Sequence, residues 1–116
     1  SGSAAAYPKK GFGLLKWGNM VECDIEFAKS RKWHVGTRAP SSHENDLLTV
    51  AMHEFGHCLG LSHSDVPGAV MEEFLVKGVM RRNLHEDDIM GRNRLYGSPK
   101  SSDGVLPAAN ELSAVR

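Results

Sequence analysis

Apolar and polar residues alternate strictly from residue 21 to residue 27, within a predicted strand at 20–27, which is the pattern of a β-strand with one buried face. The apolar positions are Val21, Cys23, Ile25 and Phe27, and the acidic positions are Glu22, Asp24 and Glu26. Gly18 and Asn19 precede this strand and suit a tight two-residue turn. The sequence therefore predicts a β-hairpin whose first arm is the apolar stretch at residues 11–17.

A helical pattern begins near residue 47. Its apolar positions are Leu47, Leu48, Val50, Ala51, Phe55, Cys58 and Leu59. Asn45 or Asp46 is placed to cap the start of the helix, and Gly60 is suited to ending it because glycine readily adopts left-handed backbone. A last helix is predicted after His85, which could cap it in a capping-box-like arrangement with Asp88.

These elements predict a single small domain of the α+β class. The chain has 116 residues and 41 % hydrophobic content, which is enough apolar material for a modest core. Residues 1–10 are expected to be a flexible lead-in, and residues 98–116, which are rich in Ser, Pro, Ala and Gly, a flexible tail. The folded domain is expected to occupy residues 11–97.

Three histidines and one glutamate within this helix and its end have the spacing of a zinc site. His53 and His57 lie four residues apart, so their imidazoles project from one helix face and can bind one tetrahedral Zn²⁺. A turn at Gly60 could bring His63 to the same ion. Three protein ligands leave the fourth position for water, as in catalytic rather than structural zinc sites. Glu54 lies beside the first ligand, where its carboxylate could reach that water.

A pair of histidines four residues apart is common, and taken alone it is best explained as two solvated side chains. Glu54, Gly60 and His63 at fixed offsets make coincidence improbable, on the order of one in ten thousand chains at average residue usage. A polar trio in an apolar helix is also difficult to explain as core packing, because buried ionisable groups are costly unless they are paired or bind a metal. The zinc interpretation is therefore preferred.

The charge balance gives no indication of a nucleic-acid or membrane partner. The chain has 14 basic and 14 acidic residues and no net charge, so no strong field directs it to nucleic acid or to an anionic membrane. No apolar run approaches the length of a membrane span. Cys23 and Cys58 could form a disulfide between strand and helix or remain buried thiols; the pairing distance cannot be read from sequence, and we favour free thiols.

The run from His53 to His63 matches His-Glu-x-x-His-x-x-Gly-x-x-His, and so resembles the signature of the metzincin metallopeptidases. These enzymes carry a methionine-containing turn (Met-turn) beneath the zinc, and residues 66–71, which end in Met71, are similar to it. Ser64 and the segments at 84–89 and 95–97 resemble the matrixins, the matrix-metalloproteinase-like branch. The strand at 22–27 resembles bacterial members. The resemblance covers residues 11–97 and is most specific from 47 to 71.

The resemblance implies a metzincin-like α+β fold. In it, the hairpin forms a sheet edge packed on the active-site helix, and the Met-turn and a C-terminal helix follow. A matrixin catalytic domain ordinarily begins with further strands and a long helix, which this sequence lacks. The chain is therefore expected to be a bacterial-type minimal member or a truncated one.

The same resemblance implies a zinc-dependent endopeptidase that hydrolyses peptide bonds with a zinc-bound water. The zinc ligands would be His53, His57 and His63, and Glu54 would be the general base. Met71 would be structural, filling space beneath the ligands.

Substrate contacts are also implied. Family members bind an extended peptide along a sheet edge, which would place it beside Gly13, Leu14 and Leu15. An ordinary hairpin arm is an equally good interpretation of these three residues. Val50 and the stretch after Met71 would line the pocket for the residue that follows the cut.

Two acidic pairs lie near this site in the sequence. Asp87 and Asp88 resemble a family pair that tethers the last helix near the Met-turn; favourable charge at a helix N-terminus explains them equally well. Glu72 and Glu73 stand where the family usually has a proline soon after the methionine, and they could favour a basic side chain in the pocket.

One catalytic zinc is expected and a structural zinc or calcium is not. The positions that carry structural-zinc ligands in animal matrix metalloproteinases are occupied by Glu26, Ala28 and Arg31 or its neighbour. The remaining histidines are expected to be exposed or capping, and they are His34, His43 and His85.

By resemblance, the partners would be a protein or peptide substrate and, besides it, a pro-segment, an inhibitor or a missing N-terminal portion. The location would be secreted or periplasmic, although no signal peptide is present in this sequence. Two alternatives stay open: a catalytically silent zinc-binding module, against which the intact Glu54 argues, and one half of a split or processed protease.

Overall fold

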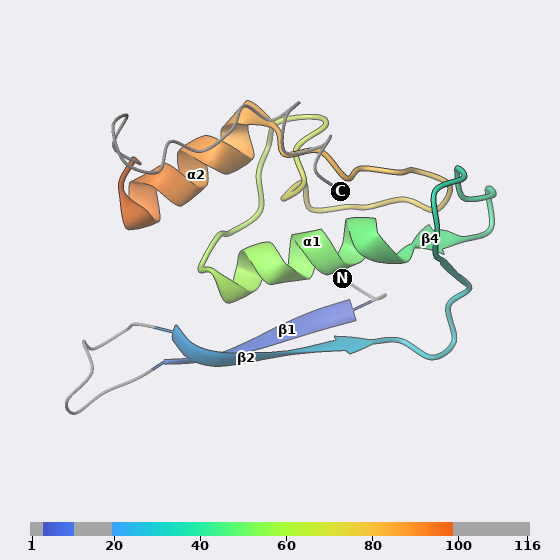
Figure 1. The fold of residues 1–116 in the computed structure, drawn as a ribbon, viewed down its shortest axis with the longest axis horizontal. Helices are drawn as coiled ribbons and strands as arrows, with labels where there is room; N and C mark the ends of the chain where they lie inside the picture. The colour runs from blue at the N-terminus through green and yellow to red at the C-terminus, as the bar shows by residue number, and fades with distance from the viewer. Residues whose placement is uncertain (1–3, 11–19, 99–116) are drawn as a thin grey trace.

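The computed structural model describes residues 4–10 and 20–98. Its centre is one helix, α1 (Leu47–Cys58), which lies between a two-stranded sheet on one side and a long loop with a second helix, α2 (Glu86–Tyr96), on the other (Figure 1). This arrangement is α+β, as the sequence predicted.

The sheet consists of β1 (Ala4–Lys10) and β2 (Met20–Phe27), which run antiparallel and pair from Ala4 with Phe27 to Lys10 with Met20. The predicted strand at 20–27 is confirmed, and its partner among the described residues is β1. The hydrogen bonds of β2 go to β1, so the flexible lead-in predicted for residues 1–10 is wrong over Ala4–Lys10. The predicted first arm and the turn at residues 18–19 lie outside the described residues.

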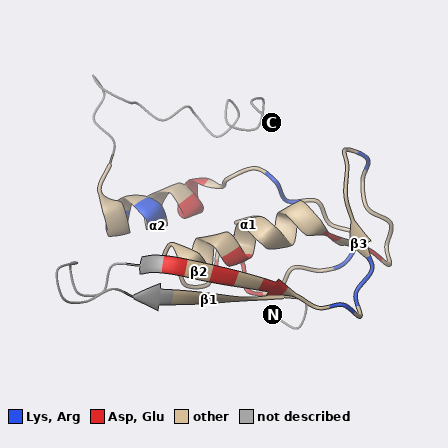
Figure 2. Ribbon diagram, turned by 60° about the horizontal axis from the view of Figure 1, so that its bottom comes forward, with Lys and Arg blue, Asp and Glu red and all other residues tan. Residues whose placement is uncertain are grey.

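The alternation of β2 is confirmed. Glu22, Asp24 and Glu26 are exposed, whereas Cys23 and Ile25 are half-buried against α1, as the two-residue period of a strand requires. Figure 2 shows the acidic positions as red bands along the ribbon of β2.

A disulfide joins the sheet to the last residue of α1. It links Cys23 in β2 to Cys58, with the two Cα atoms 5.7 Å apart, within the usual range for a disulfide. The preference for free thiols was therefore wrong. Thirty-five residues separate the two cysteines in the chain, so only the packing of α1 on β2 brings them together.

Two short strands fix the start of α1. β3 (Trp33–His34) pairs in parallel with β4 (Asn45–Asp46), and α1 begins at the next residue. Asp46 is the N-cap: its carboxylate accepts a hydrogen bond from the Thr49 amide at 3.2 Å. Of the two caps that the sequence allowed, the structure uses Asp46.

The core is small and unusually polar around α1. Its buried apolar residues are Ala4, Val50, Cys58, Ala69, Val70 and Met71. Buried polar residues accompany them, and these are His34, Asn45, Asp46, Thr49, His53, Glu54 and Asp88. The prediction that His34 is exposed or capping is wrong, because its side chain is enclosed beside Asp46.

The apolar positions of α1 are only partly covered. Phe55, which belongs to its predicted apolar set, is 57 % exposed. Among the described residues, no helix is long and apolar enough to cross a membrane.

Candidate metal centre

The three histidines of the motif converge. One ring nitrogen of each lies within 4.8 Å of the corresponding atoms of the other two, and the Nε2 atoms of His57 and His63 are 3.2 Å apart. His53 is fully buried, His57 is half-buried and His63 is exposed, so the group sits at the surface with its deepest ligand inside. The predicted ligand set is thus brought together in space.

A tight turn at the end of α1 makes this convergence possible. Gly60 has φ +100°, the left-handed conformation expected from the sequence. Its amide donates to the carbonyl of His57, and the amide of Leu61 donates to that of Gly56, both at 2.9 Å. This is a Schellman motif, which ends the helix and reverses the chain so that His63 returns to the face of His53 and His57.

Backbone carbonyls orient two of the rings. Nδ1 of His53 lies 2.8 Å from the carbonyl oxygen of Val70, and Nδ1 of His57 lies 2.8 Å from that of Leu61. A carbonyl oxygen can only accept, so both Nδ1 atoms carry the proton. The Nε2 lone pairs of both rings are therefore free for a metal, and the carbonyls act as outer partners that fix tautomer and ring orientation.

The third ring faces a carboxylate instead. Nδ1 of His63 is 3.8 Å from Oε1 of Glu73, an ion-pair distance rather than a hydrogen bond. Glu73 lies two residues after Met71, at the position where the family pattern differs from this chain. Sequence reasoning assigned it to a substrate pocket and missed its proximity to a ligand, because the path of the loop between them is not encoded locally.

The surroundings of His53 favour its neutral form. Burial lowers the pKa of His53 below the usual 6.5; the nearby His57 and His63 act in the same direction, while the bond to Val70 and the charge of Glu54 oppose it. Neutral imidazole is the form that binds zinc.

Two buried polar atoms at this point have no hydrogen-bond partner among the described residues. They are Nε2 of His53 and Oε2 of Glu54, and both side chains are at most 1 % exposed. Buried groups of this kind are rare because each costs free energy. A zinc ion on the histidine nitrogens and a water near Glu54 would satisfy both atoms, so the residues present fit the metal that the motif implies.

The Met-turn lies directly beneath the helix. Met71 is 2 % exposed, and a Cβ built on Gly56 would meet its sulfur at 2.2 Å. Gly56 lies between His53 and His57, so its missing side chain allows Met71 to contact the backbone that carries both ligands. This position supports the structural role expected of the methionine.

The start of α2 holds the Met-turn in place. The Asp88 carboxylate accepts hydrogen bonds from the backbone amides of Val70 and Met71 at 2.9 and 3.1 Å, and from the amide of His85 at 2.9 Å. Asp87 accepts a hydrogen bond from the hydroxyl of Ser64, the residue after the third ligand. Of the two interpretations of the acidic pair, the tether is realised, and the predicted capping box of His85 and Asp88 is present as well.

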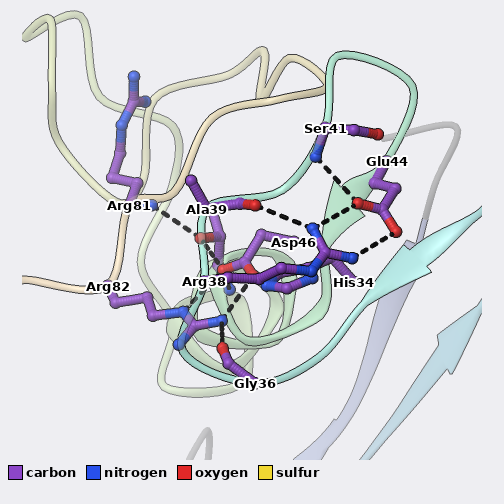
Figure 3. Close-up of polar contacts among 10 residues, drawn as sticks. His34, Gly36, Arg38, Ala39, Ser41, Glu44, Asp46, Arg81 and Arg82 are labelled. Carbon is purple, nitrogen blue, oxygen red and sulfur yellow. Dashed lines mark hydrogen bonds and ion pairs between the residues drawn. The ribbon is translucent and has the colours of Figure 1, made fainter.

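A second polar network fixes the other end of α1 (Figure 3). The Arg82 guanidinium donates to both carboxylate oxygens of Asp46, at 2.8 and 2.6 Å, and to the carbonyl of Gly36 at 2.8 Å. The amide of Arg81 donates to the hydroxyl of Thr49 at 2.8 Å. Burial raises the pKa of Asp46, but the hydrogen bonds from Arg82 and Thr49 outweigh it and hold that pKa below the usual 3.8.

This network therefore joins the segment after the Met-turn to the first turn of the active-site helix. Sequence reasoning missed Arg81 and Arg82, since two arginines in an ambiguous stretch give no local signal of their partners.

The predicted substrate residues are less well placed. Gly13, Leu14 and Leu15 lie outside the described residues. Val50 is in α1, three residues before His53, and only 2 % exposed. Glu72, whose charge was expected to face the pocket, pairs with Arg81 at 2.8 Å.

Comparison with known proteins agrees with this geometry. Residues 10–97 match the family model of the matrixins. The chain is 37 % identical over 81 residues to matrix metalloproteinase-2 of Drosophila melanogaster, covering 70 % of this chain and 11 % of that protein. It is 50 % identical over 77 residues to human matrix metalloproteinase-15 (66 % and 11 %), and 43 % identical over 79 residues to the hatching enzyme of Paracentrotus lividus (68 % and 13 %).

The chain spans only 11–15 % of the length of the curated relatives it matches. The matched region nevertheless contains the three converging histidines, Glu54 and the Met-turn, and it covers most of this chain. The chain therefore belongs to the matrixins, a family of zinc metallopeptidases of the metzincin type.

Proposed function

We propose that this chain is the zinc-binding catalytic part of an endopeptidase that cleaves protein or peptide substrates. The observation that carries the proposal is the convergence of three histidine nitrogens next to Glu54, whose buried Oε2 has no hydrogen-bond partner among residues 4–10 and 20–98. Zinc, when bound, polarises the scissile carbonyl and lowers the pKa of a water towards neutrality.

Residues of the chain itself bind the metal and transfer the proton. His53, His57 and His63 hold one zinc ion through Nε2. Oε2 of Glu54 accepts the proton of the attacking water and passes it to the leaving amine. Glu54 is only 1 % exposed, so its enclosure keeps other waters away from Oε2.

We further propose that Gly13, Leu14 and Leu15 form the edge along which the substrate lies, with Val50 and the residues after Met71 at the pocket for the residue that follows the cut. Glu72 is neutralised by Arg81, so Glu73 is the carboxylate left to influence that pocket. A secreted or periplasmic location follows from the family, and a pro-segment, an inhibitor or an N-terminal portion of the catalytic domain would be its further partners.

Cleavage of an unfolded protein tests the proposal. The chain, Glu54→Gln and Glu54→Ala are compared with and without a chelator, and zinc content is measured on each. We expect chelator-sensitive cleavage that falls by about 10²- to 10⁴-fold in both variants while zinc is retained. Zinc bound without cleavage by any of the three would instead support a silent module or an enzyme that needs its other half.

A peptide library tests the pocket. A preference for Lys or Arg after the cut, lost in Glu73→Gln and retained in Glu72→Gln, would support the assignment of Glu73. An unchanged profile in both variants would contradict it.

A further inference from the structure

A second hollow lies away from the histidines and is lined almost entirely by basic side chains. Its volume is about 340 Å³, and its lining residues are Ser30, Arg31, Lys32, His43 and Lys77. None of these is acidic. The hollow is built from three separate segments, namely the turn after β2, the loop before β4 and the chain after the Met-turn. Figure 2 shows basic segments, in blue, gathered around β3 at this end of the molecule.

The cations of this hollow differ from the other arginines nearby. Arg38, Arg81 and Arg82 are each paired with a carboxylate, from Glu44, Glu72 and Asp46 respectively. Within residues 4–10 and 20–98, the structure gives no carboxylate partner for the side chains of Arg31, Lys32 or Lys77.

The acidic residue closest in sequence, Glu44, is already engaged. The Arg38 guanidinium, helped by the Ser41 amide, lowers the pKa of Glu44 to about 2, so this carboxylate stays charged and bound to its own partners. Its side-chain hydrogen bonds go to Arg38 and Ser41, and Glu44 is not among the residues that line the hollow.

Backbone contacts hold the three walls together. The amide of Gly78 donates to the carbonyl of Glu44 at 2.8 Å, which fixes Lys77 beside the loop that carries His43. Gly78 has φ +81°, and a Cβ there would come within 3.2 Å of Ser42 Cα, so the approach of these two segments requires glycine.

Hydrogen bonds also fix the remaining segment, the turn after β2. The amide of Asn45 donates to the carbonyl of Lys32 at 2.8 Å, and the indole of Trp33 donates to the carbonyl of Ala28 at 3.0 Å. The fold thus fixes the backbone that forms the hollow, and this backbone brings the side chains of Arg31, Lys32 and Lys77 to one place on the surface.

We propose that this hollow binds a tetrahedral oxyanion, the sulfate or phosphate group of an anionic ligand. Two ammonium groups and one guanidinium supply charge-assisted donors, and the Ser30 hydroxyl supplies a neutral one. Ammonium groups on flexible stems surround a compact anion as point charges, whereas the guanidinium can contact two of its oxygens at once. The hollow is separate from the zinc site, so anion binding there can be tested independently of the peptidase activity.

Titration of the chain with inorganic sulfate and, separately, inorganic phosphate tests the proposal, with binding followed by the backbone amide signals in NMR spectra. We expect saturable shifts centred on Ser30–Lys32, His43 and Lys77. The anion that binds more tightly indicates whether the ligand carries a sulfate or a phosphate group. A triple variant, Arg31→Gln, Lys32→Gln and Lys77→Gln, is expected to lose about eightfold or more in affinity, since each exposed charge contributes about two- to fivefold.

Lys29→Gln is the matched control, because Lys29 is an exposed cation in the same turn whose side chain does not line the hollow. It should change affinity by less than about twofold. An equal loss in Lys29→Gln and in the triple variant would overturn the proposal, as would shifts that map elsewhere. Binding of a short polyglutamate peptide without binding of either oxyanion would also overturn it. Unchanged thermal unfolding of the variants shows that the fold is intact.

Discussion

Removal of the disulfide between Cys23 and Cys58 should destabilise the chain strongly. The crosslink closes a segment of 35 residues, which contains β3, β4 and nearly all of α1. In the chain-entropy model, closing a loop of this length lowers the entropy of the unfolded chain by about 13 cal/mol/K, or about 4 kcal/mol at 25 °C. That is a large fraction of the 5–15 kcal/mol typical of a domain.

The test is urea unfolding of the chain and of the double variant Cys23→Ala and Cys58→Ala. We expect a lower midpoint and a loss of about 4 kcal/mol, with a similar loss when the unaltered chain is reduced. Since Cys58 is buried and Cys23 half-buried, the variant also loses some packing, and the reduced chain separates this from the crosslink. A loss below about 1 kcal/mol in both cases would refute the entropic reasoning.

Three further changes test the supports of the site. Gly56→Ala forces a methyl group against Met71 and should cost about 1–3 kcal/mol in thermal unfolding, with weaker zinc binding; unaltered values would contradict the close approach. Asp46→Asn should cost about 2–5 kcal/mol near neutral pH because Arg82 loses its partner. The folded-state pKa of Asp46 lies below 3.8, so its contribution is complete above that pH and is lost as the pH falls through the folded value; acid unfolding curves of chain and variant should converge there. Glu73→Gln should weaken zinc binding by up to about tenfold in competition with a chromophoric chelator, and an unchanged affinity would exclude a role for Glu73 in orienting His63.

The features that sequence reasoning located correctly are local ones. The convergence of the three histidines at the end of α1, the turn at Gly60 and the capping box at His85 each depend on residues within a few positions of one another. Their geometry follows from helix periodicity and from the conformational freedom of glycine. A sequence can therefore specify them without knowledge of the rest of the fold.

The features that were missed depend on how distant segments meet. The pairing of β1 with β2, the disulfide and the bond between Arg82 and Asp46 join residues that lie far apart in the chain. Their partners are set by the path of the loops between them, which has no periodic signal. The same limit explains why the proximity of Glu73 to His63 was not predicted.

Val70 links the second helix to the deepest zinc ligand. Its amide is held by Asp88, and its carbonyl accepts the Nδ1 proton of His53. The backbone of Val70 thus connects the position of α2 to the orientation of the His53 ring. We therefore expect the smallest unit that binds zinc with full affinity to extend at least to Asp88, although the last of the three histidines is His63. A fragment that ended soon after the Met-turn would keep all three histidines and is expected to bind metal poorly.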